Sequence, residues 1–568
     1  MNRLASAGHQ HNSHLVKNIF LFVLSWGLVA FGQPHISSFL ALSAAAGGFA
    51  LFWLVLFGTV AKAKRFWLSA VWFTAVQLVQ LGWLASPTYQ GYYIVVVYLA
   101  LAVGLGLQFG GLALLLPRKG PMCWQRTLLI AGAWVLCEWS RLFFLCGFVW
   151  NPVGLALTAT VWTAQFAAMW GVFGFSFWVM LVNLLVLTSL FSRKKSDMAL
   201  AGLCFLFPCV VGALHVNYHN WRRQSTPSEK LRVALVQPSL SPDQKNLWRG
   251  KKERFVSPFQ QWARVLHDLE EKKGAKATFD LIVLPEAAFP FTAHACVYPY
   301  AEVVQTLQAV WGASAGETKA LLGGVLGEKE GAEWYVSNAF WAQALANYYS
   351  AEVVVGLVDC DKETRHCYNA AFHFKPHTLA IERYDKQVLL PLAEYVPFSF
   401  LRPLVARYGI EDSFAFGQET KIIGQRCPIS ISICYEECFG DKMRAGKQKG
   451  AQLFVNVTND GWYPASQLPK QHFTHGYLRS IENGIPVVRA CNTGVTVVID
   501  SLGHVVKRLC GREGEVEQVR GVLVASLDLY AYATLYTLWG DWFIVIVALI
   551  SVVIGSIKNI LDKKIQSI

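Results

Sequence analysis

The stretch PISISICYEECFGD, residues 428–441, alternates apolar and small polar residues and stops at Cys434. Alternation with a period of two predicts a β-strand, so the thiol stands where a strand ends. Further strand-like runs alternate with longer amphipathic segments, which predicts an α/β fold. These runs are LRVALVQPS (231–239), FDLIVLPEAAFP (279–290), EVVVGLVD (352–359), YNAAFHF (368–374), AQLFVNVT (451–458) and GVTVVID (494–500).

The composition around this α/β region indicates a membrane protein. Of the 568 residues, 54% are hydrophobic and 14% are aromatic, which is rich for a soluble chain. The formal net charge of +13 does not indicate a nucleic-acid partner, because many Lys and Arg residues lie in short loops between apolar blocks.

Seven apolar stretches before residue 218, and one after the α/β region, are long enough to predict membrane helices. They cover roughly 18–33, 38–60, 66–86, 92–116, 127–147, 160–191, 198–216 and 539–557. We therefore expect a seven-helix transmembrane region over 1–217, a catalytic domain over 218–536, and an eighth helix with a tail over 537–568.

The positive charges predict the orientation, because short loops rich in Lys and Arg stay in the cytoplasm. Such loops alternate with QPHISS (33–38) and ASPTYQG (85–91), which carry neither residue. Both termini are then cytoplasmic and the α/β domain lies outside the cytoplasm. The first apolar stretch has a second interpretation as a cleaved signal peptide, which leaves the rest of this topology unchanged.

Glu138 and Arg141 stand three residues apart inside an apolar block. Ionisable residues in a membrane helix are costly, so they pair or line a polar site. A structural ion pair and a contact with a lipid headgroup are both open here.

Two further strand ends carry residues that complement a thiol. Glu286 follows the apolar run LIVLP and can take and return protons, while Lys386 in IERYDKQVLLP can neutralise an oxyanion. Together with Cys434 they supply what covalent acyl transfer needs. Taken singly, each residue also has a structural interpretation. Glu286 could cap the next helix, Lys386 could be a solvated loop cation, and Cys434 could be a small apolar core residue.

The contexts of these three residues resemble the nitrilase superfamily, whose Glu, Lys and Cys occur in this order. The matching pieces are LPEAAFP around Glu286, RYDKQVLLPLAEYVPF around Lys386 and ICYEECFG around Cys434, extended by NVTNDGWY and QHFTHGYLRSIENGIPVVRACNTG. With the apolar blocks, the whole chain resembles the apolipoprotein N-acyltransferases of the bacterial inner membrane.

The resemblance implies a multi-pass α-helical membrane domain and a nitrilase-like α-β-β-α sandwich on the periplasmic side. It implies transfer of an acyl chain from a phospholipid, typically phosphatidylethanolamine, through a thioester on Cys434. The acceptor is the α-amino group of an apolipoprotein's diacylglyceryl cysteine, and no cofactor or metal is expected. A membrane-anchored amidase is the alternative enzyme, and an inert scaffold the non-enzymatic one.

Further positions carry over from the family one by one. Glu394 matches an acidic residue that helps to hold the lysine, and Tyr435 and Glu436 match the pair that follows the nucleophile. Trp248 falls near a substrate-gating tryptophan, with simple packing as the alternative. Trp462 forms either an acyl-chain wall or part of an interfacial belt.

The other cysteines support two expectations. Cys360 and Cys367 flank a polar turn, and a disulfide between them is allowed outside the cytoplasm. Cys434 and Cys438 resemble a metal-binding pair only loosely, because no second ligand pair stands at a suitable spacing.

One segment departs from the family pattern, and the role of one residue that follows Cys434 is ambiguous. The segment between about 311 and 351 is longer than expected and forms either a lid or an added surface hairpin. In CYEEC, Glu437 is expected to face water.

Overall fold

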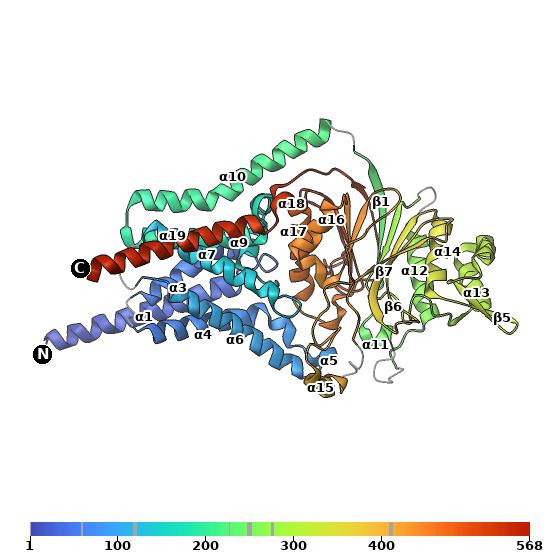
Figure 1. The fold of residues 1–568 in the computed structure, drawn as a ribbon, viewed down its shortest axis with the longest axis horizontal. Helices are drawn as coiled ribbons and strands as arrows, with labels where there is room; N and C mark the ends of the chain where they lie inside the picture. The colour runs from blue at the N-terminus through green and yellow to red at the C-terminus, as the bar shows by residue number, and fades with distance from the viewer. Residues whose placement is uncertain are drawn as a thin grey trace. The chain divides into compact units, whose positions relative to one another are not determined.

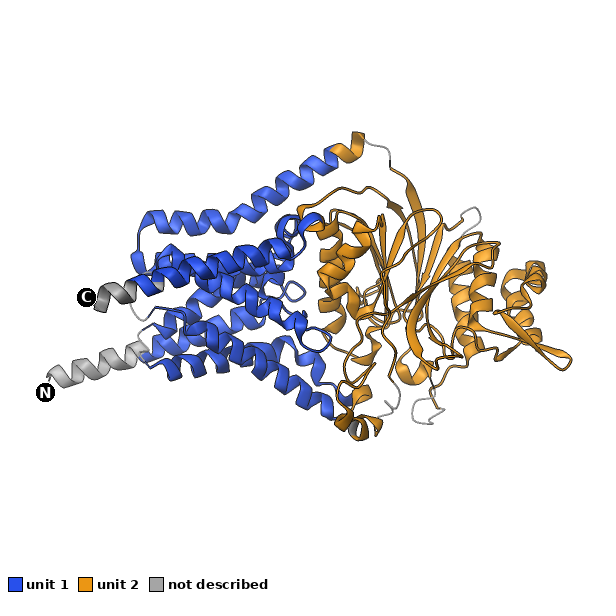
Figure 2. Cartoon of the chain, in the orientation of Figure 1, with its two compact units in different colours: residues 1–87, 92–221, 538–568 blue, residues 88–91, 222–537 orange. Residues whose placement is uncertain are grey.

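The computed structural model describes residues 2–57, 61–117, 122–225, 228–246, 253–273, 278–407 and 413–567. The chain divides into two compact units (Figure 2). Unit 1 comprises residues 1–87, 92–221 and 538–568, and unit 2 comprises residues 88–91 and 222–537. The boundaries between units fall close to those that the sequence predicts, while the predicted division into membrane and catalytic domains stays a proposal.

Unit 1 is built from helices (Figure 1). They are α1 (Asn2–Ala30), α2 (Ser38–Ser43), α3 (Phe49–Leu56), α4 (Lys62–Gln80), α6 (Tyr93–Ala113), α7 (Trp124–Ser140), α8 (Val161–Ala164), α9 (Ala167–Ser192), α10 (Lys195–Ser225) and α19 (Trp542–Ser567). In the described part of the chain, four segments are long and apolar enough to cross a membrane. They are Ser38–Leu56, Tyr93–Ala113, Ala167–Ser192 and Lys195–Ser225, and Leu15–Ala30 and Trp542–Lys558 are shorter apolar helices.

The surface of α10 illustrates why these helices suit lipid. Leu203, Phe207, Val210 and Leu214 are all exposed along it. An exposed surface of large apolar side chains is unfavourable in water but is compatible with the hydrocarbon core of a bilayer. Only four helices of the described residues are both long and apolar enough to cross a membrane. The eight crossings that the sequence predicts therefore stay a prediction.

Glu138 and Arg141 are both buried and find polar partners inside unit 1. Glu138 Oε1 accepts hydrogen bonds from Trp134 Nε1 and from the Val153 amide, both at 2.9 Å. Arg141 Nε donates to Gln108 Oε1 at 2.9 Å. These contacts favour a structural role for both residues.

Unit 2 contains two six-stranded sheets. The first has the order β15 (Gly521–Asp528), β1 (Lys230–Gln237), β2 (Leu281–Leu284), β6 (Glu352–Cys360), β7 (Cys367–Phe374) and β8 (Ile381–Asp385). The second has the order β14 (Val505–Arg508), β13 (Val497–Ile499), β12 (Val487–Cys491), β11 (Leu453–Thr458), β10 (Ile429–Ile433) and β9 (Ile422–Ile423). Central strands are parallel: β1, β2 and β6 in one sheet, and β10, β11 and β12 in the other.

Helices cover the outer faces of both sheets, which gives the α-β-β-α sandwich (Figure 1). Apolar residues of β1 and β10 share one buried cluster between the sheets, including Val233 and Ile431. On the first sheet, α12 (Pro258–Lys273) and α14 (Asn338–Tyr349) bury large residues such as Trp262 and Trp341. On the second sheet, α16 (Gly440–Gln448) contacts β10 and α17 (Leu468–Asn483) contacts β12.

The long segment after residue 311 contains a surface hairpin, which is one of the two alternatives that the sequence left open, followed by core structure. Strands β4 (Gly327–Glu330) and β5 (Glu333–Val336) pair antiparallel, and β5 also pairs with β3 (Tyr298–Pro299). The tip of the hairpin is exposed, whereas α14, which follows it, is almost entirely buried. Unit 2 also contains α11 (Pro242–Lys245), α13 (Tyr300–Trp311) and α15 (Arg402–Ala406). Two short helices, α5 (Pro87–Gln90) and α18 (Leu535–Trp539), include residues of both units.

The disulfide expected from the sequence is present between Cys360 and Cys367. The two residues are directly paired where β6 ends and β7 begins. The bridge therefore closes the turn that the sequence marks as polar.

Candidate active site

Glu286 lies in the loop that leaves the carboxyl end of β2, with only 7% of its surface exposed. Lys245 Nζ donates a hydrogen bond to its backbone carbonyl at 3.2 Å. Strand β6 passes so closely that a Cβ on Gly356 would lie 2.6 Å from Glu286 Cα. Only glycine at position 356, which has no side chain, allows the backbone of Glu286 to lie this close to β6.

Lys386 follows β8 and is held between two carboxylates. Its Nζ donates to Glu286 Oε1 at 3.1 Å and to Glu394 Oε1 at 2.8 Å. Burial lowers the pKa of Lys386, but the charges of Glu286 and Glu394 outweigh it and raise the pKa well above its usual value. Asn369 Nδ2 donates to the same two oxygens at 2.8 Å each, which fixes the group.

Cys434 begins a single 3-10 turn, Cys434–Cys438, directly after β10. Its φ of 52° lies in the left-handed region, which is uncommon for non-glycine residues. Burial raises the pKa of the thiol well above its usual value, and the charge of Glu286 adds to this while that of Lys386 opposes it. The carboxylate and the ammonium therefore both act on the sulfur.

The architecture explains why residues so distant in sequence meet. Glu286 and Lys386 follow β2 and β8, which run in the same direction because β7 is antiparallel to both β6 and β8. Cys434 follows β10 of the facing sheet. The carboxyl ends of strands thus supply a carboxylate, an ammonium and a thiol, and α/β folds usually place their chemistry at such ends.

Glu436 joins the Cys434 turn to the Lys386 loop. Its fully buried carboxylate accepts four hydrogen bonds that bridge the two sheets. The donors are the amides of Gln387 (2.6 Å), Val388 (3.1 Å) and Ile433 (2.8 Å) and the hydroxyl of Tyr384 (2.8 Å). Tyr435 is buried and its ring packs edge-to-face on Phe439, with centroids 5.0 Å apart.

The expectation that Glu437 faces water is wrong. Glu437 is fully buried, and its Oε1 lies 2.8 Å from Arg489 Nε and 3.2 Å from His472 Nε2. The 3-10 turn points this side chain inward, away from the surface, and the guanidinium of Arg489 compensates its charge.

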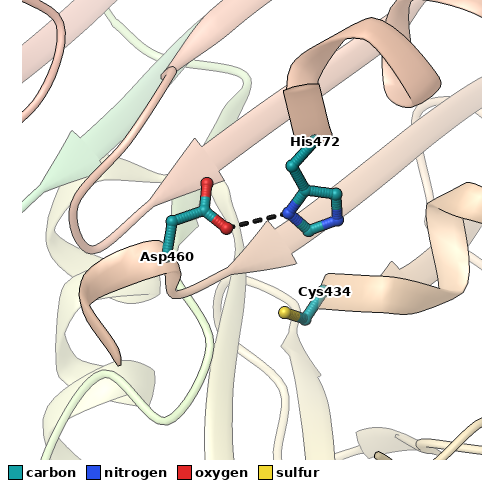
Figure 3. A group of neighbouring side chains, drawn as sticks. All are labelled: Cys434, Asp460 and His472. Carbon is teal, nitrogen blue, oxygen red and sulfur yellow. Dashed lines mark hydrogen bonds and ion pairs between the residues drawn. The ribbon is translucent and has the colours of Figure 1, made fainter. Parts of the chain in front are cut away.

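Asp460 and His472 are site residues that the sequence interpretation missed. Asp460 follows β11, and its Oδ1 lies 2.8 Å from His472 Nδ1 while its Oδ2 lies 3.3 Å from Arg489. Burial raises the pKa of Asp460, but the charges of His472 and Arg489 outweigh it and hold the pKa below its usual value. Both residues lie beside Cys434 (Figure 3).

The two expected substrate-binding tryptophans have different outcomes. Trp248 lies outside the described residues. Trp462 is half-buried, and its ring packs edge-to-face on Tyr89 of the short segment 88–91, with centroids 6.4 Å apart. Its role in binding substrate stays a prediction.

Comparison with known proteins agrees with this geometry. Residues 232–535 match the family described as carbon-nitrogen hydrolase, which defines the class of unit 2. Residues 27–185 match the apolipoprotein N-acyltransferase N-terminal domain.

Full-length relatives make the assignment more specific. The apolipoprotein N-acyltransferase of Chlamydia pneumoniae is 34% identical over 553 residues, covering 94% of this chain and 96% of the relative. That of Chlamydia trachomatis serovar D is 32% identical, covering 97% and 98%. A solved nitrilase-superfamily protein of Saccharomyces cerevisiae is 17% identical with a TM-score of 0.34, covering 53% of this chain and 90% of that one. This chain belongs to the apolipoprotein N-acyltransferase family.

Proposed function

We propose that this protein is a membrane N-acyltransferase that acylates apolipoproteins on the α-amino group of their S-diacylglyceryl cysteine. The observation that carries the proposal is the pairing of a buried Lys386–Glu286–Glu394 cluster with Cys434 in a full-length member of this family. The acyl donor is a membrane phospholipid, phosphatidylethanolamine being the proposed one.

In the first half-reaction, Glu286 accepts the proton of the Cys434 thiol. The sulfur then forms a bond to the ester carbonyl carbon, and the carbon–oxygen bond breaks. The departing lysophospholipid oxygen takes the proton back from Glu286. A thioester remains on Cys434.

Lys386 stabilises the oxyanion that forms on the carbonyl oxygen. Its raised pKa keeps it charged at neutral pH, and two carboxylates with Asn369 fix its position before substrate arrives. A preorganised charge of this kind costs no reorganisation during the reaction.

In the second half-reaction, the acceptor amine forms a bond to the thioester carbon and gives its proton to Glu286. The carbon–sulfur bond breaks, and the thiolate recovers its proton. An amide is released. A thioester suits this step because it is more reactive toward an amine than an oxygen ester is, while its sulfur leaves readily.

The membrane setting follows from the substrates. Both carry acyl chains, and moving them through water would cost about 0.8 kcal/mol per methylene. The alternation of basic and uncharged loops supports cytoplasmic termini and a catalytic domain on the periplasmic side of a bacterial inner membrane.

The test separates transferase from hydrolase. Purified protein is incubated with acyl-radiolabelled phosphatidylethanolamine, and a diacylglyceryl peptide is added later. We expect label on Cys434 that persists until the peptide arrives and then appears in the peptide as an amide. Rapid release as free fatty acid would instead identify a hydrolase.

Variants assign the roles. Cys434→Ala should abolish labelling, and Glu286→Gln should slow both half-reactions. Cys510→Ala is the matched control, because Cys510 is an exposed free thiol and its removal should change nothing. Labelling that persists in Cys434→Ala would overturn the proposal.

A further inference from the structure

Cys434, Asp460 and His472 form a compact group of possible metal ligands (Figure 3). Each offers one atom (a sulfur, an oxygen and a nitrogen), and these atoms all lie within 4.8 Å of one another. Asp460 and His472 are buried, whereas Cys434 is partly exposed. The group therefore has one accessible member and two rigidly placed ones.

The donor set is one that zinc prefers. Cysteine sulfur, histidine nitrogen and carboxylate oxygen bind Zn²⁺ at about 2.0–2.3 Å in tetrahedral geometry, which separates neighbouring ligand atoms by roughly 3.3–3.8 Å. The upper limit of 4.8 Å between the three atoms exceeds this by about an ångström. Binding therefore requires the most distant pair of ligand atoms to approach, and Asp460 Oδ1 and His472 Nδ1, which lie 2.8 Å apart, to separate by about half an ångström.

The surroundings already orient the two buried ligands. His472 Nδ1 faces Asp460 at 2.8 Å, while Nε2 lies 3.2 Å from Glu437 Oε1. If Nδ1 binds the ion, Nε2 faces the Glu437 carboxylate, and metal-binding histidines usually have such a group beside their second ring nitrogen. Arg489 holds the second oxygen of Asp460 in the same way.

The local charge favours a cation beside the sulfur. The carboxylates of Glu286 and Asp460 both act electrostatically on Cys434, and Glu437 lies next to His472. Lys386 opposes them from the side of Glu286, and Arg489, which pairs with both Asp460 and Glu437, opposes them from the other side. The three carboxylates still outnumber these two cations, so a divalent cation between Cys434, Asp460 and His472 is attracted.

We propose that Cys434, Asp460 and His472 form an inhibitory site for a thiophilic divalent cation such as Zn²⁺. On binding, the S–H bond breaks, its proton leaves to solvent and a sulfur–metal bond forms, with no electron transfer. The metal-bound sulfur cannot attack an ester, so acylation stops. A chelator removes the ion, and the sulfur regains its proton. Only the inhibition rests on the proposed function; binding itself does not.

Cobalt binding tests the site without any activity assay. The purified full-length protein is titrated with Co²⁺ and then with Zn²⁺. We expect one ion per chain, a sulfur-to-cobalt charge-transfer band in the near ultraviolet, and the intense visible bands of four-coordinate cobalt. Zn²⁺ should displace the Co²⁺ and bleach both features. If the unmodified protein gave only the weak absorption bands of six-coordinate Co²⁺, the proposal would be overturned.

Variants then identify the ligands. Cys434→Ser should remove the charge-transfer band, and His472→Gln and Asp460→Asn should each weaken Zn²⁺ binding at least tenfold. Cys510→Ser should leave binding unchanged, because this exposed thiol lies outside the group. A band that survives Cys434→Ser, or an affinity that neither buried substitution changes, would refute the site.

Protection from alkylation supplies a second readout. Zn²⁺ should protect Cys434 from maleimide in the unmodified protein, as located by mass spectrometry, and EDTA should restore the reaction. Zn²⁺ should also inhibit the transfer of label from radiolabelled phospholipid to Cys434, over the same range of Zn²⁺ concentration. Protection without inhibition would place the ion correctly but contradict the role of Cys434 as nucleophile.

Discussion

Replacing Glu436 by Gln tests how tightly the turn that begins at Cys434 is connected to the loop that carries Lys386. Each carboxylate oxygen of Glu436 accepts two hydrogen bonds: Oε1 from the amides of Gln387 and Val388, and Oε2 from the Ile433 amide and the Tyr384 hydroxyl. In Gln one of these oxygens becomes an NH₂ group, which cannot accept. Two donors therefore lose a charged acceptor in a site that is closed to water.

Hydrogen bonds to charged groups contribute about 1.5–3 kcal/mol each, so losing two costs about 3–6 kcal/mol of unfolding free energy. The loop that carries Lys386 is also released from the Cys434 turn. We expect a lower unfolding midpoint in detergent and at least about a hundredfold slower labelling of Cys434 by radiolabelled phospholipid.

The control is Glu328→Gln, which makes the same chemical change in an exposed ion pair with Lys362, where about 0–1 kcal/mol is at stake. Both variants are compared with the unmodified protein in the same detergent. An unfolding midpoint and a labelling rate for Glu436→Gln that both match those of the control would refute the proposed connection.

Three further predictions concern titration and cross-linking. Alkylation of Cys434 should be slow at neutral pH because its pKa is raised, and Glu286→Gln should shift the alkylation profile to lower pH by removing one cause; an unshifted profile would contradict this. Burial lowers the pKa of Lys245 from 10.5 to about 8, so the unfolded state holds more protons between these values and stability should rise with pH there. Relative to Lys245→Met, that gain should reach about 2–3 kcal/mol by roughly pH 10 in chemical unfolding, and a flat difference would exclude it. Replacing both Cys360 and Cys367 by Ser should lower the unfolding free energy by about 2 kcal/mol, as the short loop implies, and equal stability would show that the bridge contributes nothing.

Local periodicity predicts the α/β fold, and the three central residues are predicted from local contexts that resemble the nitrilase superfamily. Glu286, Lys386 and Cys434 each follow a strand-like run, and strand ends carry chemistry in such folds. Asp460 follows β11 in the same manner, so the same signal was available for it in NVTNDGWY. Its partner His472 lies inside α17, where helical periodicity does not distinguish an inward polar residue from a packed one.

Other features depend on contacts that no local pattern encodes. Glu437 is buried because a 3-10 turn follows Cys434 and because Arg489, on a different strand, compensates its charge. The apolar block at 160–191 resolves into α8, and α9 with non-helical backbone at Gly171, because glycine adopts the φ of 64° found there. Hydropathy registers the length of such a block but not the break inside it.

The close passage of β6 behind Glu286 has a consequence for variation in this family. Gly356 carries no functional group and sits in the middle of an ordinary strand, yet any larger residue would push the backbone of Glu286 away from its partners. A saturation scan scored by growth should therefore show that position 356 tolerates substitution as poorly as position 434. A substitution at position 356 would remove function by displacing the backbone of Glu286, although every reactive side chain would still be present.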